Sequence, residues 1–245
     1  MIRLILILIF ITLFLILSIP IMFAEWILKK FKPYAADISS LRIVQWAFKV
    51  ILFLAGTKIT VIGEENIPND TAVLYVPNHQ SYFDIIITYS RCKGLTGYVS
   101  KEFMKKIPLL GIWMKRLYCL FLKRNDMKAG LKMILTGIDQ IKHGVSMCIF
   151  PEGTRNKHPE NGPAPFKEGS LKMAEKTGCP IIPIAISNTA EIWESHMPRV
   201  KKCHVIIEYG KPIYIKDLDK HQQKFLGAYT QNIIEEMLEE HNALL

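Results

Sequence analysis

The sequence predicts an α/β protein: a layered mixed sheet flanked by helices, with an N-terminal membrane-anchoring helix. Strand-length runs of apolar or alternating residues follow one another along the chain, and longer runs with helical spacing lie between them. Alternation of this kind is typical of a layered sheet. No linker rich in serine or glycine divides the chain, so we expect one α/β domain at 57–245, preceded by an anchor and interfacial helix at 1–56.

The N-terminal segment is the uncharged apolar run from Leu4 to Phe23, which is long enough to cross a hydrocarbon core of ~30 Å as a helix. A cleaved signal peptide is the alternative. Against it, the run exceeds the usual apolar core of roughly 7–15 residues, and Met22-Phe23-Ala24 is a poor cleavage site. Arg3 precedes the run and lysines follow it at 29, 30 and 32. The positive-inside rule therefore favours a membrane protein whose remaining chain faces the cytoplasm.

A second apolar segment runs from Leu41 to Ala55, but it carries Arg42, Gln45 and Lys49. Three interpretations stay open. The segment lies in the membrane interface, or forms a core helix, or is the second arm of a membrane-docking hairpin with Pro33 at the turn.

The remaining elements follow from periodicity and from helix stop signals. Strand-like runs lie at 58–62, 72–76, 97–100, 117–122, 145–150, 179–186 and 204–209. Helix-like runs lie at 103–116, 127–143, 167–176 and 217–240. Pro108 and Gly111 are expected to break or kink the first of these helices, and Gly144 and Gly178 are natural stops after the next two.

The composition favours anionic partners. The 245 residues carry a formal net charge of +9, and 50% of them are hydrophobic, which is high for a soluble protein and ordinary for one with a membrane segment. The basic residues are spread along the chain without a zinc-finger or RNP-type pattern, so anionic lipid is favoured and nucleic acid is not expected as a partner. The five cysteines form no C-x-x-C pair, which predicts buried free thiols in a reducing compartment and no zinc site.

The segment Asn78-His79-Gln80-Ser81-Tyr82-Phe83-Asp84 places a histidine and a carboxylate five positions apart, directly after a strand-like run. On an ideal helix, five positions leave two side chains roughly 140° apart, so this pair meets only if the intervening residues form a turn. In that arrangement Asp84 fixes the tautomer of His79 and stabilises the imidazolium that forms when the other ring nitrogen accepts a proton. His79 is the candidate general base, and a structural histidine is the alternative.

The segment Phe150-Pro151-Glu152-Gly153-Thr154-Arg155 follows another strand-like run, where α/β proteins place ligands. Gly153 permits close backbone approach, Thr154 offers a hydroxyl, and Arg155 can donate two hydrogen bonds to a phosphate. This segment therefore predicts an anion site. Further candidates for the same positive surface are Lys101, Lys123, Arg124 and Lys167.

At this point a family is recognisable. Asn78-His79-x-Ser81-x-x-Asp84 resembles the first signature of the glycerolipid acyltransferases, the 1-acylglycerol-3-phosphate acyltransferase group. Phe121-Leu122-Lys123-Arg124 looks like their second block, although Lys123 stands where many members have an aspartate. The run from Phe150 to Arg155 is similar to the third block, and Ile182 to Ile186 to the fourth. The four blocks appear in the family order.

The resemblance implies acyl transfer from acyl-CoA or acyl carrier protein to the sn-2 hydroxyl of lysophosphatidic acid, giving phosphatidic acid. His79 would be the general base and Asp84 would orient it. The residues that would hold the glycerol phosphate are Arg124, Glu152, Gly153, Thr154 and Arg155. The resemblance implies no metal, no cofactor beyond the acyl donor, and no covalent intermediate, with membrane lipids as partners.

Three other functions stay open on the sequence. The acceptor could be glycerol 3-phosphate or another lysolipid. The chain could bind anionic lipid without catalysis, in which case the His79–Asp84 pair would have no task. It could also be a metal-dependent phosphoesterase, although no second clustered pair of metal ligands is apparent.

Overall fold

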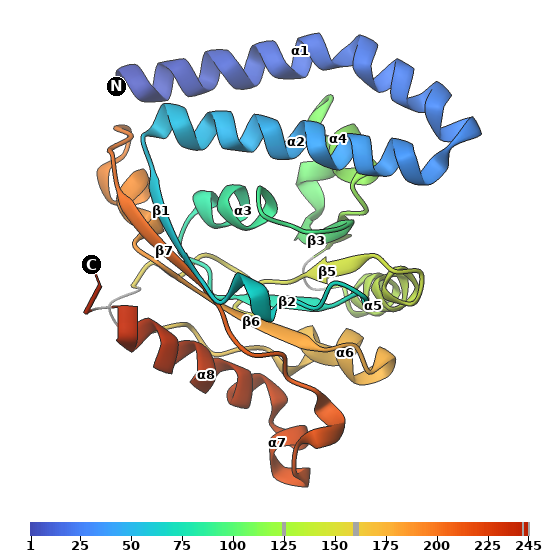
Figure 1. Ribbon diagram of the computed structural model, residues 1–245, viewed down its shortest axis with the longest axis vertical. Helices are drawn as coiled ribbons and strands as arrows, with labels where there is room; N and C mark the ends of the chain where they lie inside the picture. The colour runs from blue at the N-terminus through green and yellow to red at the C-terminus, as the bar shows by residue number, and fades with distance from the viewer. Residues whose placement is uncertain (124–125, 159–161, 242, 245) are drawn as a thin grey trace.

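A mixed sheet organises the chain in the computed structural model, which describes residues 1–123, 126–158, 162–241 and 243–244. Within these residues the sheet has seven strands in the order β1-β7-β6-β2-β5-β3-β4 (Figure 1). The strands are β1 (Lys58–Ile62), β2 (Leu74–Pro77), β3 (Thr96–Lys101), β4 (Leu120–Leu122), β5 (Ser146–Cys148), β6 (Ile181–Ser187) and β7 (His204–Tyr209). Strands β6 and β7 pair antiparallel, and the other neighbours pair parallel. The predicted fold class is confirmed.

Helices cover both faces of the sheet, so its central strands are buried on both sides. In β2, Tyr75 belongs to one hydrophobic cluster, while Leu74 and Val76 belong to the other. The first cluster takes in side chains of α1 (Ile2–Phe31), α2 (Pro33–Ala55), α3 (Tyr82–Tyr89) and α4 (Leu110–Arg116). The second takes in α5 (Met127–Lys142), α6 (Lys172–Thr177) and α8 (Leu226–His241). Successive side chains of a strand point to opposite faces of the sheet, so a strand that is buried on both faces contributes to both apolar layers.

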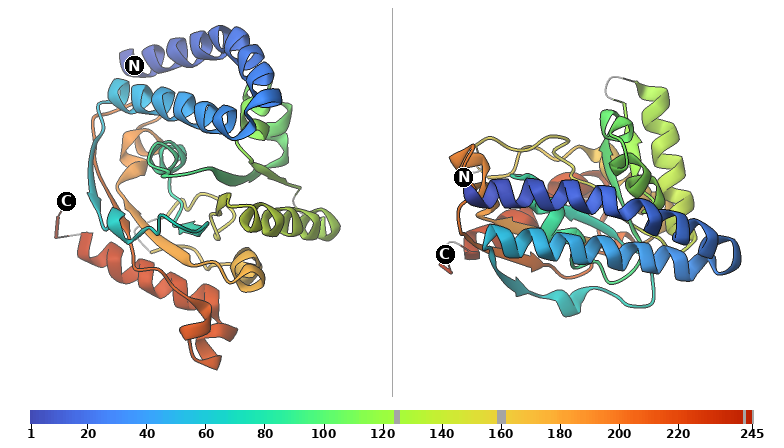
Figure 2. Two further views of the ribbon diagram at one scale, coloured as in Figure 1. Left: turned by 45° about the vertical axis from the view of Figure 1, so that its right-hand side comes forward. Right: turned by 90° about the horizontal axis from the view of Figure 1, so that it is seen from above.

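The two N-terminal helices form an antiparallel hairpin on the outside of the first layer. Both are long and apolar enough to cross a membrane, and they run side by side in both further views (Figure 2). Pro33 begins α2 at a position where its missing N–H costs nothing. The helix α1 is longer than the predicted run 4–23, because Glu25 and the lysines that follow it remain helical.

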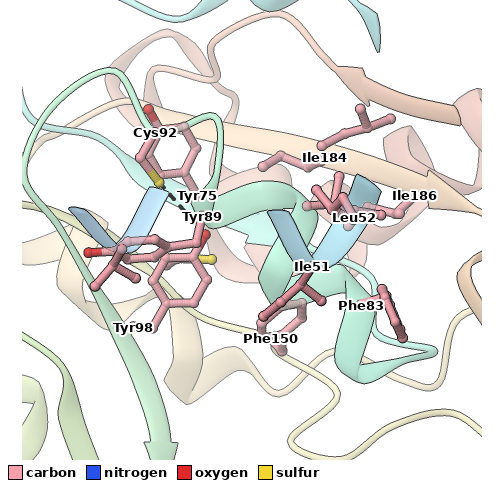
Figure 3. Packing of buried hydrophobic residues seen from close by; sticks show 14 of the residues in the cluster. Ile51, Leu52, Tyr75, Phe83, Tyr89, Cys92, Tyr98, Phe150, Ile184 and Ile186 are labelled. Atoms are coloured by element: carbon pink, nitrogen blue, oxygen red, sulfur yellow. Dashed lines mark hydrogen bonds between the residues drawn. The ribbon is translucent and has the colours of Figure 1, made fainter. Parts of the chain in front are cut away.

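Helix α2 also belongs to the core. Ile51 and Leu52 lie in the same cluster as Phe83 of α3 and Ile184 and Ile186 of β6 (Figure 3). The buried amide of Gln45 donates to the backbone oxygens of the α3 region, at 3.2 Å and 2.7 Å. The structure thus shows the helical hairpin with Pro33 at its turn and places side chains of α2 in the core, while docking of the hairpin to a membrane stays a prediction.

Several predicted elements are shorter than expected. The run 167–176 divides into a 3-10 turn (Glu168–Leu171) and α6, and β5 covers three residues of the predicted 145–150. The run 103–116 divides into a 3-10 turn (Glu102–Lys106) and α4, with Leu109 at a φ of 59° between them. Tyr118, at a φ of 60°, delays the start of β4 to Leu120. The run 217–240 divides into α7 (Lys220–Lys224) and α8. The division of 103–116 lies at Pro108, where a break or kink was expected, whereas apolar spacing alone does not show the other local turns.

The five cysteines are free thiols, as predicted. Cys92, Cys148 and Cys179 are buried, and Cys119 and Cys203 are partly exposed. Burial raises the pKa of Cys92 to about 11, so this thiol is held in its unreactive protonated form.

Candidate active site

The site lies where the carboxyl ends of neighbouring parallel strands meet. Strands β6, β2, β5, β3 and β4 are adjacent and run the same way, so the segments that follow them emerge at one edge of the sheet. His79 follows β2, Lys101 ends β3, Lys123 follows β4, Arg155 follows β5, and Glu194 lies in the segment after β6. Sheet topology therefore gathers residues from five separate parts of the chain.

The turn that His79 and Asp84 need in order to meet is present. Ser81 is the N-cap of α3, so His79 lies before the helix and Asp84 lies in its first turn. The Ser81 hydroxyl accepts from the backbone N–H of Phe83, and the Asp84 carboxylate accepts from the backbone N–H of Ser81, a reciprocal cap. The chain folds back over this cap and brings Nδ1 of His79 to 2.8 Å from Oδ2 of Asp84.

Asp84 is fully buried, and both its oxygens are used. Oδ2 accepts from His79 Nδ1 and from the backbone N–H groups of Gln80 and Ser81, each of these two at 2.7 Å. Oδ1 accepts from the hydroxyl of buried Thr189, a residue that no sequence motif marks. Because a carboxylate oxygen accepts and does not donate, the geometry assigns the proton of the neutral His79 ring to Nδ1 and the lone pair to Nε2.

The ring and backbone of His79 are held from other directions too. Phe150 stacks against the imidazole, with ring centroids 4.1 Å apart. The backbone N–H of His79 donates to Oε1 of Glu152 at 2.6 Å, and its carbonyl accepts from the N–H of Asn156 at 2.7 Å. The side chain of Asn78 pairs in both directions with the backbone of Ile186 at 2.9 Å and 2.8 Å, so the loop also starts from a fixed point on β6.

Glu152 lies beneath the His79 loop, and it is not among the residues that line the cavity described below. The residue is buried, and its second oxygen, Oε2, accepts from the backbone N–H of Ala164 at 2.9 Å. Burial raises the pKa of the Glu152 carboxyl, and the two backbone N–H groups oppose that rise. The geometry gives Glu152 contacts that fix the two loops it joins.

A cavity of about 620 Å³ opens beside the dyad, and His79, Thr154 and Arg155 line it. Its other walls include apolar side chains from α3, β3 and β4 and the ring of Phe150. Among the described residues, the basic side chains that line it are Lys101, Lys123, Arg155 and Lys167. A partly apolar cavity with cations and a histidine on its wall fits an amphipathic anion.

The backbone conformation favours glycine at 153. Gly153 has a φ of +73°, which other residues rarely adopt. Arg155 follows on the cavity wall, where Nη1 donates to Oε1 of Glu194 at 3.0 Å. Arg124 lies outside the described residues. Across the part of the chain that is described, no group of three or more His, Cys, Asp or Glu side chains is arranged to hold a metal ion.

Comparison with known proteins identifies the family of the chain. Residues 58–187 match the family model described as Acyltransferase. The chain is 30% identical over 191 residues to the 1-acyl-sn-glycerol-3-phosphate acyltransferase of Borreliella burgdorferi. This alignment covers 78% of this chain and 76% of that protein. The chain is 26% identical over 208 residues to the protein of the same name from Saccharomyces cerevisiae, covering 82% and 67%.

The fold has a solved counterpart. The crystal structure of the 1-acyl-sn-glycerophosphate acyltransferase from Thermotoga maritima superposes with a TM-score of 0.84, covering 99% of this chain and 95% of the other at 24% sequence identity. At this identity the likeness concerns the fold.

Proposed function

Because this chain belongs to the acyltransferase family, we propose that it transfers an acyl group from a thioester to the sn-2 hydroxyl of 1-acylglycerol 3-phosphate, giving phosphatidic acid. The family membership supports the reaction type. The observation that carries the proposal is the position of the His79–Asp84 pair on the wall of a cavity that also presents basic side chains.

His79 is the general base in this mechanism. Nε2 takes the proton of the sn-2 hydroxyl while that oxygen attacks the carbonyl carbon of the thioester. The tetrahedral intermediate then collapses, its C–S bond breaks, and the imidazolium returns the proton to the leaving thiolate. Asp84, at 2.8 Å from Nδ1, stabilises the imidazolium between these two transfers. The substrate hydroxyl is the nucleophile, so no acyl-enzyme forms.

The acceptor phosphate binds to the basic side of the cavity. Arg155 offers a planar donor fork that matches phosphate oxygens, and Lys101, Lys123 and Lys167 add positive charge. Thr154 and the backbone at Gly153 lie on the same wall. We assign Glu152 the task of fixing this loop against the His79 loop, since its carboxylate accepts from backbone groups of both segments.

The membrane supplies the acceptor and holds the product. The helix α1 has large apolar side chains that are exposed along its length, among them Leu13 and Leu17. We propose that 1–56 attaches the chain to the membrane and that 57–245 is the catalytic domain on the cytoplasmic side, following the positive-inside rule. Trp113 and Arg116 of α4 donate to Ser18 Oγ and to the Met22 carbonyl of α1, so the attached helix is fixed relative to the domain that carries the site.

A single assay tests this function and its rivals. Purified protein is given 1-acylglycerol 3-phosphate with acyl-CoA or, separately, with an acyl carrier protein thioester, and phosphatidic acid is measured. Parallel arms offer glycerol 3-phosphate, another lysophospholipid and monoacylglycerol as acceptors. We expect turnover that depends on the acceptor phosphate and is unchanged by a metal chelator. Binding of 1-acylglycerol 3-phosphate without turnover on either donor would contradict the proposal and leave a lipid-binding protein.

A further inference from the structure

Glu194 joins the two halves of the site, although it lies beyond the residues 58–187 that match the family model. Its oxygen Oε2 accepts from the hydroxyl of Ser81 at 2.7 Å. Its oxygen Oε1 accepts from the backbone N–H of Tyr82 at 2.9 Å and from Nη1 of Arg155 at 3.0 Å. One carboxylate therefore binds the first turn of α3, which orders the His79–Asp84 pair, and the arginine of the loop after β5.

Arg155 is restrained on two sides by this arrangement. Its guanidinium carbon lies 3.8 Å from the ring centroid of Tyr82, and its Nη1 is paired with Glu194. A stacked and paired guanidinium has a fixed plane. Since a guanidinium has five N–H donors, the bond to Glu194 still leaves donors for two bonds to a phosphate. The restraint thus orders Arg155 without using up its binding capacity.

We propose that Glu194 is a positioning residue that sets the distance between the phosphate site and the base. The inference rests on the proposed function and deepens it. Ser81 and Tyr82 are close in sequence to His79, so a carboxylate that binds both of them and Arg155 holds the acceptor phosphate at a fixed place relative to Nε2 of His79. Without it, Arg155 has to be ordered by the substrate, and this ordering weakens binding of the acceptor.

The test compares Glu194→Gln with a matched control. Glutamine can still accept from Ser81 or Tyr82 but no longer carries the charge that pairs with Arg155. We expect KM for 1-acylglycerol 3-phosphate to rise by about ten-fold, because a charge-assisted bond becomes a neutral one, and kcat to stay within about three-fold. The control is Glu191→Gln, which removes a nearby exposed carboxylate paired with His196 at 2.8 Å. Its KM should equal that of the wild type.

A double-mutant cycle separates positioning from general loss of structure. In an Arg155→Ala background, Glu194→Gln should produce no further rise in KM, because the side chain it orders is absent. An unchanged KM in folded Glu194→Gln protein, or a full additional rise in the Arg155→Ala background, would overturn the inference. Melting temperatures of the four proteins show that each one is folded.

The dissociation constant of 1-acylglycerol 3-phosphate, measured without an acyl donor, distinguishes failure of the inference from failure of the proposed function. If the wild type makes no phosphatidic acid, the proposed function fails. A larger dissociation constant for Glu194→Gln than for Glu191→Gln still supports the role of Glu194. If the wild type is active and both variants bind the acceptor equally well, the role of Glu194 is refuted and the function stands.

Discussion

The substitution Asp84→Asn removes one charge from the site while keeping its shape. The amide oxygen can take the place of Oδ2, where three N–H groups donate, and the amide N–H₂ can then face Thr189. The threonine hydroxyl can accept from this amide and thereby loses Oδ1 as its own acceptor, so the cost of the substitution falls on Thr189 and not on the Oδ2 side. The cap of α3 and the tautomer of His79 are therefore retained, and the variant should fold.

The expected loss follows from the missing charge. At an effective dielectric constant of about 20, unit charges ~4 Å apart interact by roughly 4 kcal/mol. The imidazolium forms only during the reaction, so most of this stabilisation acts on the transition state. Since 1.36 kcal/mol corresponds to about a factor of ten in rate, we expect kcat to fall by about 10²–10³-fold. The dissociation constant of the acceptor should change little, because Asp84 lies behind His79 and does not line the cavity.

Initial rates of phosphatidic acid formation check this value, with saturating donor and a titration of 1-acylglycerol 3-phosphate. Thermal unfolding monitored by circular dichroism shows whether the variant is folded. A folded Asp84→Asn protein with kcat within about three-fold of the wild type would refute the reasoning, because the carboxylate charge would then have no part in the rate.

Three further predictions follow from other parts of the structure. Arg155→Lys should lower kcat/KM for 1-acylglycerol 3-phosphate by about ten-fold or more, because lysine keeps the charge but loses the donor fork. The loss of kcat/KM for monoacylglycerol should be much smaller, and equal losses for the two acceptors would show that Arg155 supports the loop instead. Burial raises the pKa of Glu152 above its ordinary value of 4.5, so the folded state holds this proton more tightly than the unfolded chain does. The contribution of Glu152 to the free energy of unfolding therefore falls as pH rises through the raised pKa. In Glu152→Gln, the free energy of unfolding should depend less on pH in this range. Removal of residues 1–23 should weaken membrane attachment, because Leu4–Phe23 is the uncharged run long enough to cross the hydrocarbon core; carbonate-washed membranes should retain the full-length protein and lose the truncated one, and loss of the full-length protein would refute the assignment.

Local patterns in the sequence predicted the sheet, its flanking helices and the requirement for a turn between His79 and Asp84. The turn forms because Ser81 caps the helix, and an N-cap is a local signal. The antiparallel hairpin with Pro33 at its turn was one of the open interpretations, because proline at the first position of a helix is also a local signal.

Contacts between distant segments were not predictable in the same way. Thr189 and Glu194 lie in short 3-10 turns after β6, in a stretch that has no apolar period. They reach Asp84 and Ser81 across 105 and 113 positions of sequence, only because parallel pairing brings the ends of β2 and β6 to one edge. Glu152 was expected among the phosphate ligands, and its contacts with the N–H groups of His79 and Ala164 depend equally on tertiary packing.

The most direct test of the account is the rate of phosphatidic acid formation by His79→Ala, measured beside the wild type with the donor that the wild type uses. General-base catalysis contributes about 10²–10⁴-fold, so turnover should fall by that factor. The variant should fold with a lowered melting temperature, because Asp84 loses one of its donors and Phe150 loses its stacked ring, and its affinity for 1-acylglycerol 3-phosphate should be close to that of the wild type, because Arg155 is unchanged. Near-normal turnover by folded His79→Ala protein would contradict the mechanism.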